Sequence, residues 1–386
     1  MLIPISNTPR EYSWGSQTLI PALEGRVPTG RPEAEVWFGA HPGSPSRADD
    51  GRTLDAVLAG AGHAPLPYLL KILAAGRSLS IQAHPSVPEA VAGFAREEAA
   101  GIPRDADHRT YRDDNHKPEI IVALSDRFRA LVGLRPLEDT RRLLAGLGDA
   151  PGITALRHRL SDDDAGGRDD ARALRDTLAW VLSDDGRAAV DDVIGVLSET
   201  PAVDGFAEEI EVLRTIAGDF PGDPGVVVAL LMNLVVLRRG EALFAPAGVL
   251  HAYQDGLGVE LMAASDNVLR GGLTPKHVDV AELLAVVDTT PGPAPIVRPT
   301  ERDGEAVYDV GVADFRLGRV AVTAGEPVEL AVEGPTILLV TAGEVEISGS
   351  DTVRIPTGRA AFASADEGRL MLSGAGEVFV ARPGRA

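Results

Sequence analysis

Two short stretches of the chain place possible metal ligands at regular spacings. In LSIQAHP, residues 79 to 85, Gln82 and His84 are two positions apart, and residues with this spacing point to the same face of a β-strand. In GEALFAPAGVLHAYQD, residues 240 to 255, His251 lies in a second strand-like segment. Amide and imidazole groups, completed by a carboxylate, suit Zn²⁺, Mn²⁺ or Fe²⁺. The sequence therefore predicts a metal site that contains Gln82, His84 and His251.

Two glutamates are candidates for the carboxylate ligand. Spacing within the first motif favours Glu89, but Ser86 and Glu89 also form the S-x-x-E pattern of a helix capping box. The second candidate is Glu119, in DDNHKPEIIVAL, where Lys117 and Glu119 share a strand face because the proline between them favours an extended backbone. On spacing alone, the two glutamates are equally good candidates.

The positions of the lysines suggest the charge of the substrate. Only three of the 37 basic residues are lysines, and Lys71, Lys117 and Lys276 all lie in or beside the stretches that carry the candidate ligands. Arg270, in SDNVLRGGLTPK, adds a fourth cation. Because the formal net charge is −20, an anionic substrate would need a local cluster of cations. A metal beside lysines and an arginine therefore predicts a small anionic substrate, such as a sugar phosphate.

The composition of the chain excludes several other classes of protein. There is no cysteine, which excludes disulfides, thiolate nucleophiles and sulfur-ligated metals. No basic stripe is visible, so nucleic-acid binding is not expected. The N-terminal residues lack the layout of a signal peptide, and the longest apolar run, residues 226–237, is shorter than the ~20 residues that span a membrane. We expect a soluble, cytoplasmic protein that acts as a monomer.

The hydrophobic pattern changes twice along the chain and predicts three domains. Residues 1–135 and 237–300 contain short strands and turns, and we expect them to form one domain that holds the metal site. Between them, residues 136–236 follow the helical period, which indicates a helical insert. Residues 301–386 alternate as strands do and contain no histidine, which indicates a C-terminal β-domain without a metal. The expected fold class is mainly β with an α-helical insert.

The order and content of these motifs resemble known families. The stretches around Gln82 and His251 resemble the two signatures of cupin jelly-roll barrels, with Gln82 in place of the usual first histidine. Four longer stretches resemble the motifs of the type I mannose-6-phosphate isomerase family, and together they cover the catalytic core: LPYLLKILAAGRSLSIQAHP, DDNHKPEIIVAL, PAGVLHAY and SDNVLRGGLTPK. The resemblance implies a catalytic cupin domain, a helical domain and a cupin-like C-terminal domain.

The resemblance also implies the cofactor and the roles of particular residues. One Zn²⁺ per chain would be bound by Gln82, His84, Glu119 and His251, which favours Glu119 over Glu89. Arg270 would stabilise negative charge, and Lys117 is a candidate for proton transfer. Four residues would place the substrate or line its pocket: Lys71, Ser80, Tyr253 and Asp266.

The reaction that the resemblance implies interconverts mannose 6-phosphate and fructose 6-phosphate through a cis-enediol(ate), and it would feed mannose metabolism and the supply of GDP-mannose. This aldose–ketose shift needs a base, an acid and stabilisation of the enediolate. Two alternatives are a non-catalytic sugar-binding bicupin and a cupin metalloenzyme with redox chemistry, such as a dioxygenase. Metal analysis would test the second, and ligand binding without isomerisation would indicate the first.

Overall fold

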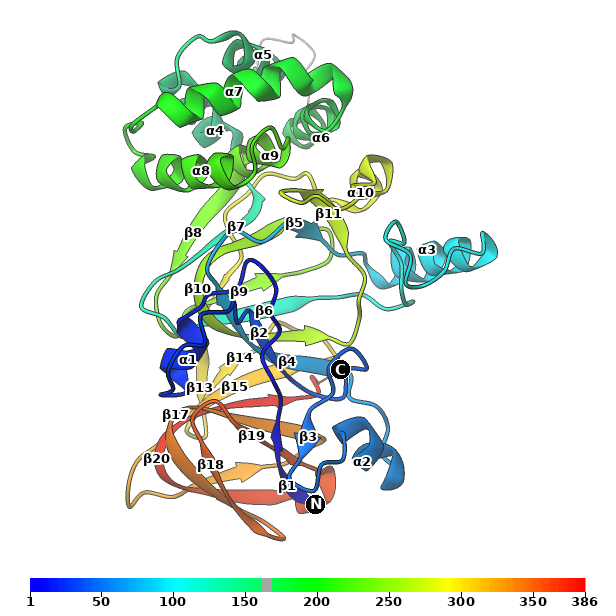
Figure 1. The fold of residues 1–386 in the computed structure, drawn as a ribbon, viewed down its shortest axis with the longest axis vertical. Helices are drawn as coiled ribbons and strands as arrows, with labels where there is room; N and C mark the ends of the chain where they lie inside the picture. Colours follow the sequence, from blue (N-terminus) through cyan, green and yellow to red (C-terminus); the bar gives the residue numbers. More distant parts are fainter. Residues whose placement is uncertain (162–168, 386) are drawn as a thin grey trace.

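The structure, a computed structural model, describes residues 1–161 and 169–385. Two large antiparallel sheets and a layer of helices are stacked along the long axis of the molecule (Figure 1). The expected fold class, mainly β with a helical insert, is confirmed. Within the part of the chain that the structure describes, no helix is both long and apolar enough to cross a membrane.

The middle layer, called here the site sheet, has ten strands, and β10 (His251–Ala263) lies at its centre. β10 pairs with four other strands of this sheet, namely β4, β5, β6 and β7. Segments that precede and segments that follow the helical insert in the sequence therefore form one sheet. Its other strands are β2 (Glu35–Phe38), β4 (Tyr68–Ala75), β5 (Ile81–Ala83), β6 (Glu119–Ala123), β7 (Phe128–Leu134), β8 (Met232–Leu237), β9 (Ala242–Ala245), β11 (Leu269–Gly272) and β12 (Ile296–Val297).

The helical layer packs on one face of the site sheet (Figure 1). Its apolar core includes Ile81 and Ala83 of β5 and Ala252 of β10. Because side chains alternate along a strand, the polar neighbours of these residues point to the opposite face. The helices of this layer are α4 (Leu137–Gly146), α5 (Pro151–Arg159), α6 (Asp170–Val181), α7 (Arg187–Glu199), α8 (Ala207–Asp219) and α9 (Gly225–Leu231), with the short helix η1 (Asp184–Gly186) between α6 and α7.

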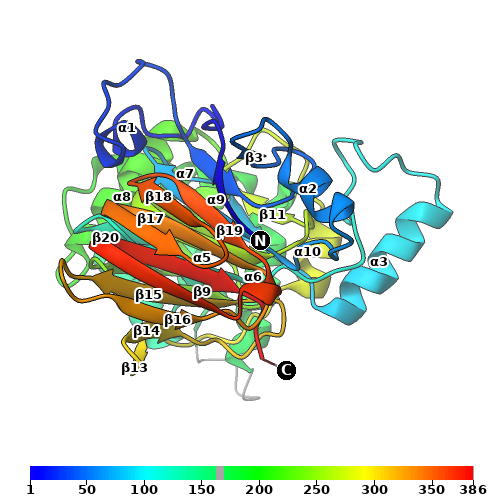
Figure 2. The same ribbon diagram turned by 90° about the horizontal axis from the view of Figure 1, so that it is seen from below.

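The third layer, called here the C-terminal sheet, also has ten strands (Figure 2). Eight come from the end of the chain, and two are β1 (Leu2–Ser6) and β3 (Arg47–Ala48) from its beginning. The eight are β13 (Thr300–Arg302), β14 (Glu305–Tyr308), β15 (Arg316–Val322), β16 (Val328–Ala331), β17 (Thr336–Ser348), β18 (Thr352–Pro356), β19 (Ala360–Ala363) and β20 (Arg369–Arg382), and the short helix η2 (Ala365–Glu367) precedes β20.

Two details differ from the domain boundaries predicted from the sequence. We expected residues 1–135 to lie wholly in the metal-binding domain, but β1 pairs with β19, with Leu2 opposite Ala363. We also expected the helical insert to continue to residue 236, but β8 begins at Met232 and pairs with β7. Both differences arise because residues far apart in the sequence pair as strands, which a local hydrophobic pattern does not reveal.

The two sheets share an apolar core. This core combines Phe38 and Leu70 of the site sheet with Ile337 and Phe379 of the C-terminal sheet. The hydroxyl of Tyr68 donates to the carbonyl oxygens of two residues near or within the C-terminal sheet, at 2.8 and 3.0 Å. The remaining helices are α1 (Leu19–Leu23), α2 (Leu54–Gly60), α3 (Val87–Ala99), which projects from the body in Figure 2, and α10 (Val280–Val286).

Candidate functional site

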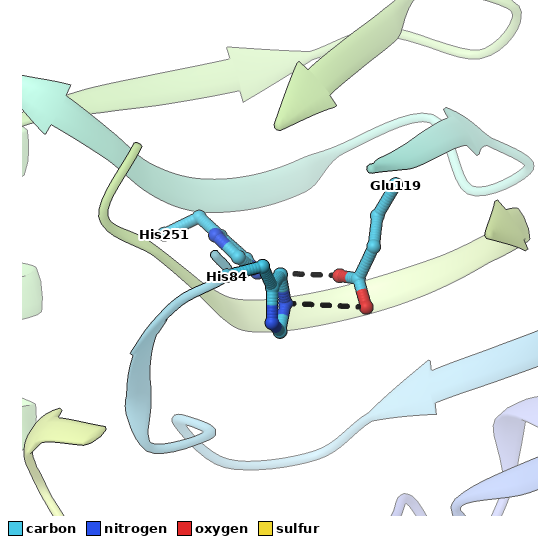
Figure 3. Close-up of side chains that lie close together, drawn as sticks. All are labelled: His84, Glu119 and His251. Carbon is cyan, nitrogen blue, oxygen red and sulfur yellow. Dashed lines mark ion pairs between the residues drawn. The ribbon is translucent and has the colours of Figure 1, made fainter. Parts of the chain in front are cut away.

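Three of the predicted ligands converge at the inner face of the site sheet (Figure 3). Nε2 of His84 lies 3.4 Å from Oε1 of Glu119, and Nε2 of His251 lies 3.2 Å from Oε2 of the same carboxylate. One candidate ligand atom from each residue lies within 4.8 Å of the other two, and all three side chains are buried. This arrangement of two imidazoles and one carboxylate can bind a divalent metal ion.

Hydrogen bonds from the Nδ1 atoms of His84 and His251 hold the two rings in orientations that suit metal binding. Nδ1 of His84 donates to the backbone oxygen of Asn267 at 2.7 Å, and Nδ1 of His251 donates to that of Val249 at 3.0 Å. Both Nε2 atoms are therefore directed toward Glu119, as in metal sites whose ligating histidines are held by carbonyl groups.

The protonation states of these residues also fit a metal site. Nε2 of His84 is buried and has no hydrogen-bond partner among the described residues. Burial, together with the charge of Lys117, lowers the pKa of His84 from 6.5 to about 4. Burial alone would raise the pKa of Glu119, but Lys117 and His84 hold it well below its usual value. At neutral pH the site thus offers a neutral imidazole and a carboxylate, which are the forms that bind metals.

The pairing of three strands sets the position of Gln82. In β5, Gln82 lies directly opposite His251 of β10 on one side and Arg270 of β11 on the other. Directly opposite residues of an antiparallel pair have adjacent side chains. Gln82 therefore lies between His251 and Arg270, and its amide nitrogen, Nε2, donates to Oγ of Ser80 at 3.2 Å.

The structure separates the two glutamates that spacing left as equal candidates. The side chain of Glu89 accepts hydrogen bonds from the backbone nitrogen and from Oγ of Ser86, at 2.8 and 2.6 Å. This is the predicted capping box at the start of α3. Glu119, in contrast, lies between His84 and His251, so the structure brings Glu119 and not Glu89 to the candidate site.

The candidate ligands adjoin a cleft of about 610 Å³, a size suited to a small molecule. The buried Lys117 is one of its lining residues, with Nζ 2.9 Å from Oε1 of Glu119. His116 points elsewhere and pairs with Asp314 at 2.7 Å. The cleft is lined by Gln82, Glu119 and His251 and by all of the residues predicted to contact the substrate: Lys71, Ser80, Lys117, Tyr253, Asp266 and Arg270.

Lys71 lies in a buried cluster that the sequence did not reveal. Its Nζ is 2.9 Å from Oε2 of Glu260 and 3.7 Å from Oε1 of Glu35. Burial alone would lower the pKa of Lys71, but the surrounding carboxylates raise it above its usual value. Both glutamates line the cleft, and their ion pairs with Lys71 mean that this lysine is not a free cation.

Glu260 escaped prediction because β10 is irregular. Simple alternation from His251 would place Glu260 on the opposite face of the strand. The pairing of β10 with β7 shifts register between Tyr253 and Asp255, and Gly256 has a positive φ of 124°. This bulge reverses the alternation, so that His251, Tyr253 and Glu260 all line one cleft.

Tyr253 and Asp266 lie at different depths of the cleft. Tyr253 is buried, and its ring packs edge-on against Phe128 with a centroid distance of 5.5 Å. Burial, with the nearby charge of Glu260, raises the pKa of Tyr253 well above its usual value. The half-exposed carboxylate of Asp266 lies 3.2 Å from Nε2 of His41, which lowers the pKa of Asp266.

The fold and the candidate site define a class of protein: a β-rich, cupin-type protein with a buried group of metal ligands in a cationic cleft. A family model described as phosphomannose isomerase type I, catalytic domain, matches residues 2–137. The chain is 34% identical to the mannose-6-phosphate isomerase of Escherichia coli over 96% of this chain and 97% of that protein. It is 29% identical to the human mannose-6-phosphate isomerase over 92% of this chain and 90% of that protein.

Solved structures agree with the sequence comparison. A crystal structure of mannose 6-phosphate isomerase bound with zinc and yttrium is 33% identical, with a TM-score of 0.88 and full coverage of both chains. A variant of phosphomannose isomerase from Salmonella typhimurium has a TM-score of 0.89 at 32% identity, again over both whole chains. The chain belongs to the type I phosphomannose isomerase family. This confirms the predicted family and does not favour the two alternatives, the sugar-binding bicupin and the redox cupin.

Proposed function

We propose that this protein interconverts mannose 6-phosphate and fructose 6-phosphate with Zn²⁺ as its cofactor. The observation that carries the proposal is the buried group of His84, Glu119 and His251 beside a cationic cleft, in a chain that aligns along almost its whole length with proteins named for this reaction. Relatives whose structures contain zinc support the choice of metal.

Four residues would hold the metal: Gln82, His84, Glu119 and His251. Two features fit this role: the buried Nε2 of His84 has no hydrogen-bond partner among the described residues, and the carboxylate of Glu119 faces the Nε2 atoms of both histidines. When bound, zinc supplies a Lewis acid that polarises sugar oxygens. Asn267 and Val249 would fix the histidine rings through their backbone oxygens.

The isomerisation moves a proton between C2 and C1 of the sugar. A base removes the proton from C2 of the aldose, and the carbonyl oxygen at C1 gains a proton to give the enediol. The hydroxyl proton at C2 then leaves as the ketone forms, and a proton is added at C1. Lys117 is one candidate for proton transfer, since it lines the cleft beside Glu119. Glu260 is a second candidate, because burial raises its pKa although Lys71 opposes this shift, and a raised pKa suits a group that exchanges protons near neutral pH.

The half-buried Arg270 is placed to stabilise negative charge on the intermediate. It lies beside Gln82 across the β5–β11 pair and lines the cleft, and its side chain has no hydrogen bond or ion pair with any of the described residues. Lys71, Ser80, Tyr253 and Asp266 would orient the sugar. A preorganised guanidinium stabilises charge that develops during the reaction without a further cost of reorganisation.

Chelation tests the metal requirement of this proposal. Treatment with EDTA should abolish the conversion of mannose 6-phosphate, and added Zn²⁺ should restore it, because the ligands persist in the folded protein. The activity should be followed by the appearance of fructose 6-phosphate, with zinc content measured on the same samples. Full activity in protein shown to be free of metal would contradict the proposal.

The cellular setting is also a proposal. If it has the proposed activity, the protein would feed mannose metabolism and the supply of GDP-mannose. We propose that it acts as a monomer and that it does so in the cytoplasm. The absence of cysteine is compatible with a reducing compartment. The segments that form the site sheet would make the catalytic domain, with the helical layer and the C-terminal sheet as separate domains. Light scattering and cell fractionation would test the monomeric state and the location.

A further inference from the structure

The cations of the cleft fall into two groups. The deep cations are already paired: Lys71 with Glu260, Lys117 with Glu119, and the buried Arg109 with Glu97 and Glu98. Arg112 and Arg270 also line the cleft, but neither has an ion pair or a side-chain hydrogen bond with any residue in the ranges 1–161 and 169–385. On a chain with a net charge of −20, unpaired arginines in a cleft are available to an anion, and Arg112 and Arg270 are two of them.

The two unpaired arginines lie close enough to affect each other. Burial, followed by the positive charge of Arg112, lowers the pKa of Arg270, and Asp107 opposes this with a smaller effect. Arg270 is half-buried and lies next to Gln82, whereas Arg112 is exposed. The two arginines therefore provide positive charge at two depths, one beside the metal ligands and one nearer to solvent.

The backbone of Arg112 is fixed relative to the metal site. The buried side chain of Asn267 accepts hydrogen bonds through Oδ1 from the backbone nitrogens of Arg112 and Asp113, at 2.7 and 3.2 Å. The backbone oxygen of the same Asn267 accepts from Nδ1 of His84 at 2.7 Å. One residue thus anchors both a candidate metal ligand and the base of the Arg112 side chain, which leaves the guanidinium free to reach into the cleft.

We infer that Arg112 binds the phosphate of the substrate near the opening of the cleft, with Arg270 on the metal side of it. The inference rests on the proposed function. It assigns binding of the phosphate to Arg112, a residue that was not among the predicted substrate contacts. In a hexose 6-phosphate the reacting carbons, C1 and C2, are at the opposite end of the sugar from the phosphate. If C1 and C2 lie at the buried ligands, the phosphate extends toward solvent, where a dianion and an exposed guanidinium need not lose all of their hydration.

Two other unpaired cations of the cleft are weaker candidates. Lys276 is exposed in the loop after β11, and its ammonium group lacks the planar fork that matches two phosphate oxygens. Arg77 also lines the cleft, but its backbone nitrogen donates to the backbone oxygen of Trp14 at 3.1 Å and not to Asn267. Among Arg112, Arg77 and Lys276, three cations that are unpaired within the described residues, Arg112 is the one whose backbone is held by Asn267, the residue that also anchors His84.

The test compares zinc-loaded wild-type protein with Arg112→Ala, Arg112→Lys and Arg302→Ala. Arg302 lies exposed on β13 and outside the cleft, so its loss matches the change in net charge. The dissociation constant of a hexitol 6-phosphate, which has no carbonyl group and cannot isomerise, reports binding independently of activity. The kcat and KM for mannose 6-phosphate report the reaction.

For Arg112→Ala we expect the dissociation constant and the KM to rise at least tenfold, because a charge-assisted bond to phosphate is lost. The kcat should stay within about threefold of wild type, since this contact is made equally in the ground and transition states. Arg112→Lys should lie between wild type and Arg112→Ala, and Arg302→Ala should match wild type. Zinc content should be equal in all four proteins.

Different results overturn different claims. If Arg112→Ala binds the hexitol 6-phosphate as tightly as Arg302→Ala does, the phosphate-binding role of Arg112 is wrong, even if the protein is an active isomerase. If wild-type protein binds the hexitol 6-phosphate and Arg112→Ala does not, but neither converts mannose 6-phosphate, the proposed function fails while the phosphate site stands. If wild-type protein does not bind the hexitol 6-phosphate, the inference is also wrong.

Discussion

The site sheet and the C-terminal sheet have similar architectures but different functions. Each has ten antiparallel strands, and each has a central strand of 13 residues, β10 and β17. Strand β10 directs His251, Tyr253 and Glu260 into a cleft. The corresponding interior of the C-terminal sheet is filled by apolar residues, including Leu338, Val340, Val345 and Ile347 of β17. The difference in function thus comes from the residues on the inner face and not from the architecture.

The contrast extends to the buried charges. Among the described residues, the one group of His and acidic side chains that meets the geometry of a metal site belongs to the site sheet. Buried charges are tolerated only when they are paired or coordinate a metal, and the site sheet pairs Lys71 with Glu260 and Lys117 with Glu119. The C-terminal sheet also has a buried ion pair, between Arg382 and Glu305, but its inner face is packed with aliphatic side chains and stabilises the protein through burial of apolar surface.

The largest expected effect comes from the metal ligands. His84→Ala and Glu119→Ala should strip the zinc and lower kcat/KM by on the order of 10³-fold or more, because a Lewis acid that contributes several kcal/mol is lost. Glu89→Ala is the control: it should keep its zinc and lower the free energy of unfolding by about 1 kcal/mol through loss of the helix cap. Metal analysis beside steady-state kinetics checks both. Loss of zinc from Glu89→Ala but not from Glu119→Ala would reverse the assignment of the carboxylate ligand.

The next effect concerns charge stabilisation by Arg270. Arg270→Ala should lower kcat by about 10²-fold or more, as for the loss of one preorganised group that stabilises developing charge. Arg270→Lys should restore only part of the activity, because an ammonium cannot reproduce the planar fork of donors. Folding and zinc content should be normal in both variants. A kcat near that of wild type in Arg270→Ala, with only KM raised, would assign this arginine to ground-state binding instead.

A core substitution in the C-terminal sheet should lower the stability of the protein and leave its kcat and zinc content unchanged. Leu338 is fully buried in an apolar cluster, so Leu338→Ala should lower the free energy of unfolding by about 2–5 kcal/mol through a cavity and lost burial. Denaturant unfolding measures this loss. At a temperature where the variant is folded, its kcat and zinc content should match wild type, and a specific loss of zinc would show that the two sheets are not separate in function.

The smallest effect is a pH dependence of stability in metal-free protein. The pKa of His84 is 6.5 in the reference state and about 4 in the fold. Between these values the unfolded chain binds a proton that the folded chain does not, so the free energy of unfolding should fall as the pH is lowered through this window. Urea unfolding of EDTA-treated protein would measure the slope. His84→Gln should show a shallower slope than wild type, and equal slopes would mean that His84 does not contribute.

Much of the site could be predicted from short-range patterns in the sequence. The two-residue spacing of Gln82 and His84 in a strand, and the capping box that explains Glu89, depend only on local geometry. The choice of Glu119 needed the resemblance to a known family, because nothing local shows that β6 lies beside β10. The helices of the insert followed from their hydrophobic period.

Three features could not be predicted because they depend on long-range packing. The pairing of β1 with β19 joins residues more than 350 positions apart, and no local pattern encodes it. Glu260 faces the cleft only because a bulge near Gly256 reverses the alternation of β10. Arg112 is one of many arginines in the sequence, and it stands out only when its anchoring by Asn267 and its lack of an acidic partner among the described residues are seen.

The most direct test of the account is an NMR experiment in D₂O. Zinc-loaded protein is incubated with mannose 6-phosphate, and the spectra report both the sugars present and the hydrogen isotope at C2. We expect fructose 6-phosphate to appear and deuterium to enter C2 of the remaining mannose 6-phosphate, because a base that removes the C2 proton can exchange it with solvent before returning it. His84→Ala should show neither change. Binding of the sugar phosphate without product and without exchange at C2 would contradict the claim that this cleft catalyses isomerisation.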